Sequence, residues 1–348
     1  MEITVIIFLS SGLFLGWALG ANDAANVFGT AVGSRMLNFS TAAIICSIFV
    51  ILGAVISGAG VSNTLGKLGV INSLAGSFMA ALSAAFAVYS MTKIQLPVST
   101  SQAIVGAIIG WNLYSNTSTN PESLSKIVTT WVVCPILAAI LAAGLFKVVT
   151  VFLSVKKIHL LRTDAYTRFG LIVAGAFGSY SLGANNIGNV MGVFVEANPL
   201  TAFAILDVIN FSASQQLFLL GGLAIAVGVF THSKRVMMTV GNNLLPLSPI
   251  AAWVAVVSHS VVLFIFASQN LEAFLLSNNW PTFPLVPVSS SQAIIGAVIG
   301  IAFVRGGQGM QWSLLGKITL GWLVTPILAG IICFVGLFFI QNVFNQQV

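Results

Sequence analysis

The sequence predicts an all-α integral membrane protein built from two inverted repeats, with broken helices and two re-entrant half-helix hairpins. Three observations predict this class: the composition, the recurring apolar runs and a duplicated set of motifs. Of the 348 residues, 57% are hydrophobic and 6% are charged, and the mean hydropathy is +1.03. Because roughly a quarter of the residues in a soluble globular domain are charged, the composition excludes that class.

Apolar runs of about 20 residues recur along the chain, and each is long enough to cross a hydrocarbon core of roughly 30 Å as a helix. The first run has no basic segment before it and no cleavage site after it, so we expect a retained span and not a removable signal. The predicted spans are residues 1–18, 41–59, 74–91, 127–153, 169–182, 217–230, 250–267 and 317–341.

A short polar motif follows the first apolar run and returns in the second half of the chain. It reads GANDAAN at residues 20–26 and GANNIGN at residues 183–189. Polar groups at this depth in a membrane are tolerated only where they face protein, water or a ligand. We therefore expect each helix to break at its glycine, Gly20 or Gly183, and the two copies to form one binding site.

A second motif is also duplicated. PVSTSQAI at residues 97–104 returns as PVSSSQAI at residues 287–294, and a short apolar piece follows each copy, at 103–111 and 293–303. At 1.5 Å per residue, such a piece covers about half the thickness of a membrane. The sequence therefore predicts two half-helices that enter the membrane and turn back.

A third match pairs residues 126–137 with residues 317–328, and the common order of all three matches indicates a duplication. The repeats cover residues 1–153 and 169–348. Between them lies a basic linker, residues 154–168, which the positive-inside rule places in the cytoplasm. Both chain ends carry almost no positive charge and are expected to be external, which requires an odd number of spans in each repeat and hence an inverted repeat.

Hydroxyl groups occur where both half-helices should begin. A helix N-terminus carries about half a positive charge and free N–H groups, and hydroxyls there can cap the helix or donate to ligand oxygens. These features predict a site for a dehydrated tetrahedral oxyanion; the alternative is ordinary helix capping. The predicted substrate-binding residues are Asp23, Ser99, Thr100, Ser101, Asn186, Ser289, Ser290 and Ser291.

Asp23 is the only carboxylate in the first pair of motifs, and an ionisable group within a span is a candidate functional group. Beside an anion this carboxylate needs a cation or a proton, so we expect coupling to Na⁺ or H⁺. The alternative is that Asp23 only caps a half-helix. Na⁺ prefers hard oxygen ligands. The predicted sodium ligands are Asn22, Asp23, Asn26, Asn185, Asn186 and Asn189.

The other ionisable residues give weaker signals. Asp207 has two equally weighted interpretations, a coupling group and a charge at a helix end. His159, His232 and His259 show no metal-ligand spacing and are expected to be exposed or satisfied in the structure. The chain has no nucleotide-binding loop, no nucleophile–base pair and no metal cluster. We therefore expect a protein that is not an enzyme, needs no cofactor and binds no nucleic acid.

Together, the duplicated GANDAAN and PVSTS motifs resemble the inorganic phosphate transporter (PiT) family of cation-coupled permeases, over nearly the whole chain. The resemblance implies a transport domain against a scaffold domain, homodimerisation in a lipid bilayer, and symport of phosphate with Na⁺ or H⁺ through alternating access. It also implies that ligands come from Asn22 and Asp23 in the first motif and from Ser99, Thr100, Ser289 and Ser290 in the second. The inner (plasma) membrane of a bacterium is the expected location.

The chain departs from the pattern of this family at three positions. Asn186 stands where the second copy usually has Asp, and Gly188 replaces the usual Ala. Val50 follows Ser47-Ile48-Phe49, where some members have a glutamate. Fewer carboxylates suggest fewer coupled cations or a different oxyanion, so a sulfate permease on the same fold is the main alternative. A channel is a further alternative, disfavoured by the two occluding half-helices.

Overall fold

The computed structural model describes the chain except for residues 1–2, 95–96, 157–158, 206–208, 239–244 and 246. The first repeat forms α1 (Ile3–Gly33), α2 (Phe39–Ser57), α3 (Ala59–Gly66), α4 (Leu74–Lys93), α5 (Thr100–Tyr114) and α6 (Pro121–Lys156). The second forms α7 (Leu160–Met191), the 3₁₀ turn η1 (Gly192–Phe194), α8 (Ala213–Met238), α9 (Pro249–Ala267), α10 (Gln269–Ser277), α11 (Ser290–Val304) and α12 (Trp312–Asn342). A small antiparallel hairpin, β1 (Phe203–Ile205) with β2 (Ile209–Phe211), interrupts the helical chain.

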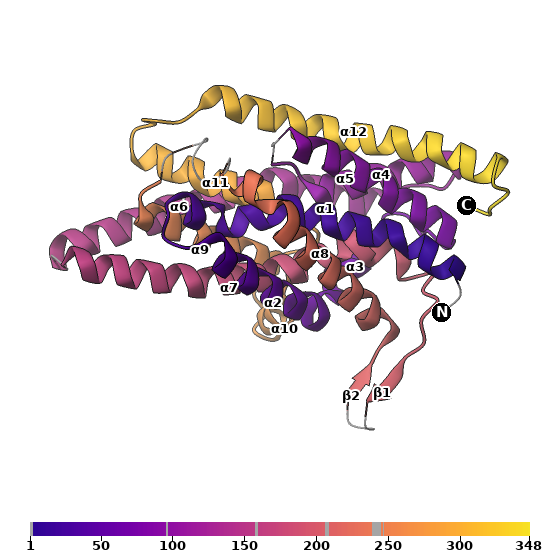
Figure 1. The fold of residues 1–348 in the computed structure, drawn as a ribbon, viewed down its shortest axis with the longest axis horizontal. Coiled ribbons are helices and arrows are strands. Elements are labelled where there is room, and N and C mark those ends of the chain that lie inside the picture. Colours follow the sequence, from indigo (N-terminus) through magenta and orange to yellow (C-terminus); the bar gives the residue numbers. More distant parts are fainter. Residues whose placement is uncertain (1–2, 95–96, 157–158, 206–208, 239–244, 246) are drawn as a thin grey trace.

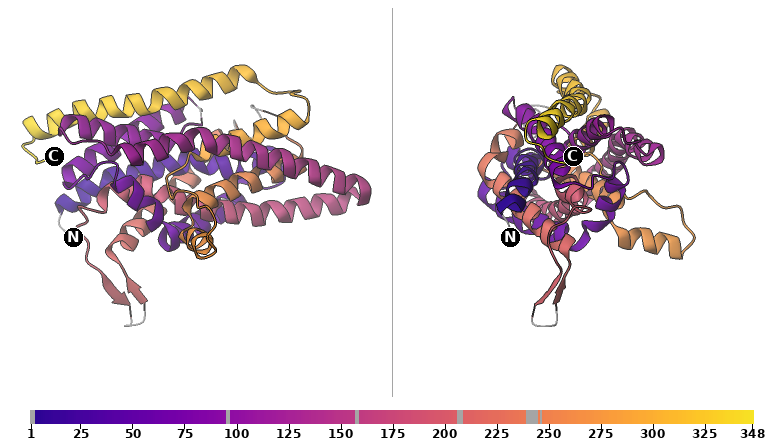
Figure 2. Two further views of the ribbon diagram at one scale, coloured as in Figure 1. Left: turned by 180° about the vertical axis from the view of Figure 1, so that it is seen from behind. Right: turned by 90° about the vertical axis from the view of Figure 1, so that its right-hand side faces the viewer.

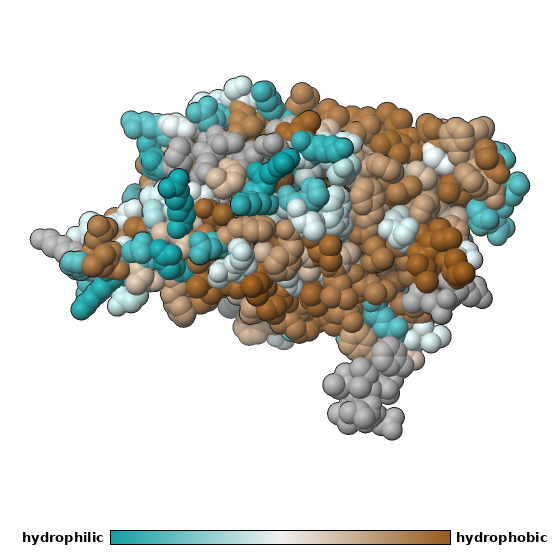
Figure 3. Space-filling view, viewed as in Figure 1, coloured by the Kyte–Doolittle hydropathy of each residue, from teal (hydrophilic) through white to brown (hydrophobic). Residues whose placement is uncertain are grey.

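Seven helices within the described residues are long and apolar enough to cross a membrane, namely α1, α2, α4, α6, α8, α9 and α12. Apolar residues form a broad band over the side of the molecule, and hydrophilic residues gather toward its two ends (Figure 3). This pattern matches a protein whose middle is surrounded by lipid. The all-α membrane class predicted from composition is therefore confirmed.

The two copies of the first motif lie on helices that run in opposite directions. Arg168 near the start of α7 donates to the carbonyl oxygen of Met36, just beyond the end of α1, at 2.7 Å. At the other end of this pair, Met191 of α7 packs close to Gly12 of α1. The antiparallel arrangement of α1 and α7 is the one that an inverted repeat requires.

Both termini lie at one end of the molecule, and the junction of α6 with α7 forms the opposite end (Figures 1 and 2). We refer to these as the terminal end and the linker end. The linker end is mostly helical, since α6 continues to Lys156 and α7 begins at Leu160. The basic segment 154–168 is thus built largely from the ends of two long helices and not from an extended loop.

Each repeat packs its helices against those of the other. Helix α1 lies against α8 and α7 against α2, and in the same way α5 lies against α12 and α11 against α6. Glycines make these seams close: a Cβ at Gly20 would overlap the Ile225 carbonyl of α8, and a Cβ at Gly183 would overlap the Val50 carbonyl of α2. The repeats are therefore interlocked, because small residues let helix backbones approach closely in membranes.

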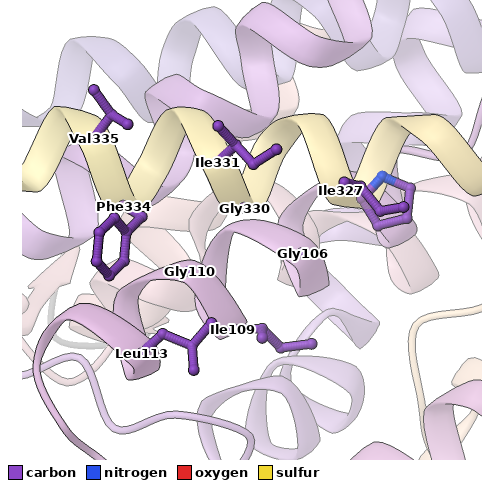
Figure 4. Close-up of a pocket in the computed structure, with 10 residues that line it drawn as sticks. Gly106, Ile109, Gly110, Leu113, Ile327, Gly330, Ile331, Phe334 and Val335 are labelled. Atoms are coloured by element: carbon purple, nitrogen blue, oxygen red, sulfur yellow. The ribbon is translucent and has the colours of Figure 1, made fainter.

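The seams of the two short helices leave apolar grooves on the outside of the molecule. One groove of about 390 Å³ lies between α5 and α12 and is lined by Ile109 and Leu113 of α5 and by Ile331 and Phe334 of α12 (Figure 4). Its counterpart between α6 and α11 measures about 420 Å³. Ile331 is 57% exposed. These grooves suit lipid chains and offer no polar group to an ion.

The prediction that the motif helices break at their glycines is wrong. Helix α1 continues from Ile3 to Gly33 through Gly20, and α7 continues from Leu160 to Met191 through Gly183. A helix interior keeps every backbone group bonded, which lipid-buried segments require. The glycines serve helix packing, and the helix interruptions that reach the middle of the protein lie before α5 and before α11.

Candidate functional site

The N-termini of α5 and α11 meet in the middle of the protein. Ser99 caps α5 by accepting from the Gln102 N–H, and Ser289 caps α11 by accepting from the Gln292 N–H, both at 3.2 Å. The Ser101 hydroxyl donates to the Val288 carbonyl oxygen at 3.0 Å, which joins the two helix starts. Two positive helix ends therefore point toward one small buried region.

Helix α4 brings the chain to this region, and α5 leads it back toward the terminal end. The two helices are antiparallel, since Gly76 near the start of α4 packs against Trp111 near the end of α5. Asn112 at the end of α5 donates to the Leu68 carbonyl oxygen at 3.2 Å, just before α4. The end of α4 at Lys93 and the start of α5 at Thr100 therefore lie at the same, inner end of this helix pair.

Asn22 and Asn185 hold the segments before the two short helices. The side-chain oxygen of Asn22 accepts from the Val98 N–H, and that of Asn185 accepts from the Val288 N–H, each at 3.2 Å. Asn22 also donates to the Thr92 hydroxyl at 2.9 Å. The two asparagines occupy equivalent positions in the repeats and make equivalent contacts, so both tie a motif helix to the loop that precedes a helix N-terminus.

Asn26 and Asn189 join the repeats to each other. The Asn26 amide donates to the Ser290 hydroxyl at 3.1 Å, and the Asn189 amide donates to the Ser101 hydroxyl at 2.9 Å. Asn189 also donates to the side-chain oxygen of Asn186 at 2.9 Å. Each motif helix thus reaches the hydroxyl cluster of the opposite repeat, and both copies contribute to a single site.

Asp23 is buried in this site beside Thr100, with 1% of its surface exposed. The Thr100 hydroxyl contacts this carboxylate, and the Asp23 Oδ1 atom has no geometric hydrogen-bond partner among the described residues. A buried carboxylate without a partner is costly. The site therefore contains a buried carboxylate oxygen that a cation or a proton would satisfy, next to the hydroxyl of Thr100.

Including Asp23 Oδ1, five buried side-chain oxygens of the site have no donor among the described residues. They are side-chain oxygens that accept hydrogen bonds and cannot donate them. Buried polar atoms are nearly always paired in folded proteins. Their clustering at the two helix starts indicates a polar ligand, and cations bind such oxygens directly. The unpartnered acceptors are Asp23 Oδ1, Asn26 Oδ1, Gln102 Oε1, Asn189 Oδ1 and Gln292 Oε1.

Comparisons with known proteins decide the family. A model of the phosphate transporter family matches residues 19–273 and 270–348. The chain belongs to the phosphate transporter family. This assignment confirms the resemblance based on the duplicated motifs.

Relatives of this family member cover nearly all of it. A proposed phosphate permease of Methanocaldococcus jannaschii is 27% identical over 336 residues, 96% of this chain and 97% of the relative. The sulfate permease CysP of Bacillus subtilis is 28% identical over 344 residues, 94% of this chain and 85% of the relative. A solved structure named "The sodium-dependent phosphate transporter" has the same fold, with a TM-score of 0.75, 23% identity, and 96% and 99% of the two chains covered.

The structure of this phosphate transporter family member brings together every site residue predicted from the sequence. It also adds His259, which was expected to be exposed or structurally satisfied. His259 on α9 is fully buried, its Nε2 lies 2.9 Å from the Ser290 hydroxyl, and its Nδ1 has no partner among the residues that the structure describes. The rule that selected Asp23, an ionisable group within a span, also applies to His259. Asp207 lies outside the described residues.

Proposed function

We propose that this family member is a secondary active transporter that imports inorganic phosphate by symport with Na⁺ or H⁺ through alternating access. One observation carries this proposal: two oppositely directed helix N-termini meet beside a cluster of unpartnered oxygens. The helix ends suit an anion, whereas the oxygens suit a cation or a proton. A site with both features can bind the anion together with its coupling cation or proton.

Phosphate would lie between the starts of α5 and α11. The Ser99 and Ser289 oxygens accept from N–H groups in the helix caps, which does not use their protons, whereas the Ser101 proton goes to the Val288 carbonyl oxygen. The proposed donors to phosphate are therefore the hydroxyls of Ser99, Thr100, Ser289, Ser290 and Ser291. No Lys or Arg side chain is part of either motif pair. Binding through neutral donors and helix ends is weak enough for release, which transport requires.

The coupling ion would lie among the acceptor oxygens near Asp23. A proton can satisfy one oxygen, whereas Na⁺ takes several oxygen ligands at once, so the cluster of acceptors favours Na⁺. The structural neighbour is named a sodium-dependent transporter, which describes that protein. For this chain, the proposal of Na⁺ rests on its own unpartnered oxygens, which belong to Asp23, Gln102, Gln292 and two of the motif asparagines, Asn26 and Asn189.

Two polar cavities on opposite sides of the site support alternating access. A cavity of about 420 Å³ at the terminal end reaches Val286, whose carbonyl oxygen accepts from Asn185 at 3.4 Å. A second, of about 140 Å³, reaches Thr92, whose hydroxyl accepts from Asn22. The larger cavity ends at the hydrogen bond of Asn185 to Val286, and the smaller one ends at the hydrogen bond of Asn22 to Thr92. We propose that loosening these two contacts in turn opens the site to each side.

The distribution of basic residues supports an orientation. Lys67 and Lys126 lie at the terminal end, in the larger cavity. Positive charge marks the cytoplasmic side of membrane proteins, so we propose a cytoplasmic linker end, external termini and import from the larger cavity. The basic residues at the linker end are Arg35, Lys156, Arg162, Arg168, Lys234, Arg235, Arg305 and Lys317.

Sulfate is a second candidate substrate. The relative CysP is named a sulfate permease, and Asn186 replaces the carboxylate that the second motif of the family usually carries. At neutral pH, phosphate carries a proton that an acceptor such as Asp23 can bind, but sulfate carries none. A site with unpartnered acceptors therefore favours phosphate. Competition of labelled phosphate uptake by excess sulfate discriminates the two substrates.

Uptake into proteoliposomes tests the proposed function. We expect labelled phosphate to accumulate when Na⁺ is imposed outside, and to accumulate less when only a proton gradient is imposed. Phosphate uptake that does not change with either gradient would contradict the proposed coupling. Stronger uptake of sulfate than of phosphate would favour a sulfate permease. The homodimer remains a prediction that the mass of the solubilised particle tests.

A further inference from the structure

We infer that His259 is a positioning residue that sets the direction in which the Ser290 hydroxyl donates, and thereby the affinity of the site for its oxyanion. This inference rests on the proposed function, because it takes the start of α11 as part of the oxyanion site. It concerns a residue outside both duplicated motifs, on a helix that contributes no other side chain to the proposed ligand set.

The hydrogen bonds around Ser290 carry the inference. The Ser290 oxygen accepts from the Asn26 amide at 3.1 Å and lies 2.9 Å from His259 Nε2. A serine hydroxyl has one proton to donate and two lone pairs to accept with. With Asn26 on one lone pair, the Ser290 proton goes either to His259 or to a ligand, and His259 decides which.

His259 has two tautomers with opposite effects on Ser290. If Nε2 carries no proton, it accepts the Ser290 proton, and the hydroxyl is closed to the oxyanion. If Nε2 carries the proton, it donates to the second lone pair of Ser290, and the Ser290 proton is directed to the oxyanion. The other ring nitrogen, Nδ1, is buried and has no partner in the described part of the chain in either case. Protein contacts therefore do not fix the tautomer, and the ligand can select it.

Each repeat contributes one half-site, the start of its short helix with the motif residue beside it, and the two half-sites differ in the group that contacts the hydroxyl. In the first half-site, the Thr100 hydroxyl lies beside the Asp23 carboxylate. The equivalent of Asp23 is Asn186, whose amide donates to the Leu182 carbonyl oxygen of its own helix and whose oxygen accepts from Asn189. The second half-site therefore lacks the carboxylate, and its hydroxyl is instead contacted by an imidazole.

The imidazole comes from a helix that is itself duplicated. Ser73 caps α4 and Ser248 caps α9, each by accepting from the N–H three residues on. Counting from these caps, Ser258 of α9 matches Ser83 of α4, and His259 matches Ala84. A histidine thus replaces a methyl group in the repeat whose motif lacks the carboxylate. The two exchanges together keep one polar partner for the hydroxyl at each helix start.

Phosphate uptake kinetics of purified protein in proteoliposomes test this role. His259→Phe keeps a ring but removes the nitrogen that contacts Ser290. We expect the KM for phosphate to rise about tenfold, the effect of losing one hydrogen bond to a charged ligand, with Vmax changed less than about twofold. His259→Gln should bring the KM back to within about threefold of wild type, because an amide can donate to Ser290.

A double variant separates positioning from general packing. If His259 acts through Ser290, His259→Phe should have little further effect in a Ser290→Ala background. Effects on KM that multiply would overturn the assignment, as would an unchanged KM in His259→Phe. Where His259→Phe does not fold, His259→Leu, which also lacks the nitrogen that contacts Ser290, gives the same comparison in the two backgrounds. His159→Gln, at the exposed start of α7, is the matched control.

The outcome also distinguishes this role from the proposed function. Wild-type protein without phosphate or sulfate uptake would defeat the proposed function itself. Wild-type uptake with a KM that does not respond to His259 substitutions would defeat only the role of His259.

Discussion

At the scale of single residues, the site combines hydrogen-bond donors at two helix starts with acceptor oxygens that have no donor among the described residues. Asp23 stands out because it is a buried carboxylate with an unpartnered oxygen. Its equivalent, Asn186, bonds to the Leu182 carbonyl oxygen within α7. The same position thus carries an unpartnered carboxylate oxygen in one repeat and an amide bonded to its own helix in the other.

Replacing Asp23 with Asn should abolish ion-driven uptake, lowering the rate more than about 100-fold. The change keeps the shape of the side chain but removes the negative charge that the coupling ion would balance. Gradient-driven phosphate uptake measures the loss, and the elution profile of the detergent-solubilised protein reports on folding. Glu196→Gln, an exposed carboxylate after η1, should transport like wild type. Sodium-driven uptake by Asp23→Asn at the wild-type rate would contradict the proposed coupling.

Removing the Asn185 side chain should raise the KM for phosphate at least about threefold. The Asn185 oxygen holds the Val288 N–H next to the start of α11, and its loss leaves a buried N–H without a partner. Concentration-dependent uptake measures the change. Asn278→Ala, at the exposed end of α10, is a control that should leave the KM unchanged. An unchanged KM in Asn185→Ala would mean that this asparagine does not position the helix start.

At the scale of helices, four close seams hold the repeats together, and glycines make them possible. Sequence patterns predicted the spans well, because long apolar runs indicate helices directly. They misjudged Gly20 and Gly183 as helix breaks, because a glycine looks the same in sequence whether it ends a helix or receives the backbone of a neighbour. Only the position of α8 against α1, and of α2 against α7, reveals the second role.

Gly183→Ala should destabilise the protein by about 1–3 kcal/mol, since the added methyl group would overlap the Val50 carbonyl. Thermal unfolding in detergent measures this as a lower midpoint. Gly144→Ala provides the matched control: a Cβ there meets nothing within 4 Å, so it should leave stability unchanged or raise it by about 0.5–1 kcal/mol. Equal midpoints for the two variants would contradict the role of the seam.

The meeting of the duplicated motifs was predicted better than the packing around them. Duplicated motifs indicated that residues from both repeats meet, and Asn26, Ser101, Asn189 and Ser290 do so in mutual hydrogen bonds. His259 was missed because it lies on a helix that carries neither motif, and nothing in its local sequence indicates that α9 passes beside the start of α11. Contacts between helices that are distant in sequence depend on packing, which local patterns do not contain.

At the scale of the whole molecule, we propose that the site is reached from two cavities and that the basic linker end is cytoplasmic. Labelling of introduced cysteines tests that orientation. In whole cells, a membrane-impermeant maleimide should label Lys126→Cys and should label Arg162→Cys only after permeabilisation. The natural cysteines Cys46, Cys134 and Cys333 are buried and should react little. The reverse labelling pattern would invert the proposed direction.

The central claim is that the oxyanion binds where α5 and α11 begin. The most direct test is a crystal structure of the protein with arsenate, a phosphate analogue, and Na⁺, recorded at the arsenic absorption edge. We predict an anomalous peak within hydrogen-bond distance of the Thr100 and Ser290 hydroxyls. A peak confined to the cavity beside Lys67 and Lys126, with none between the two helix starts, would contradict the account.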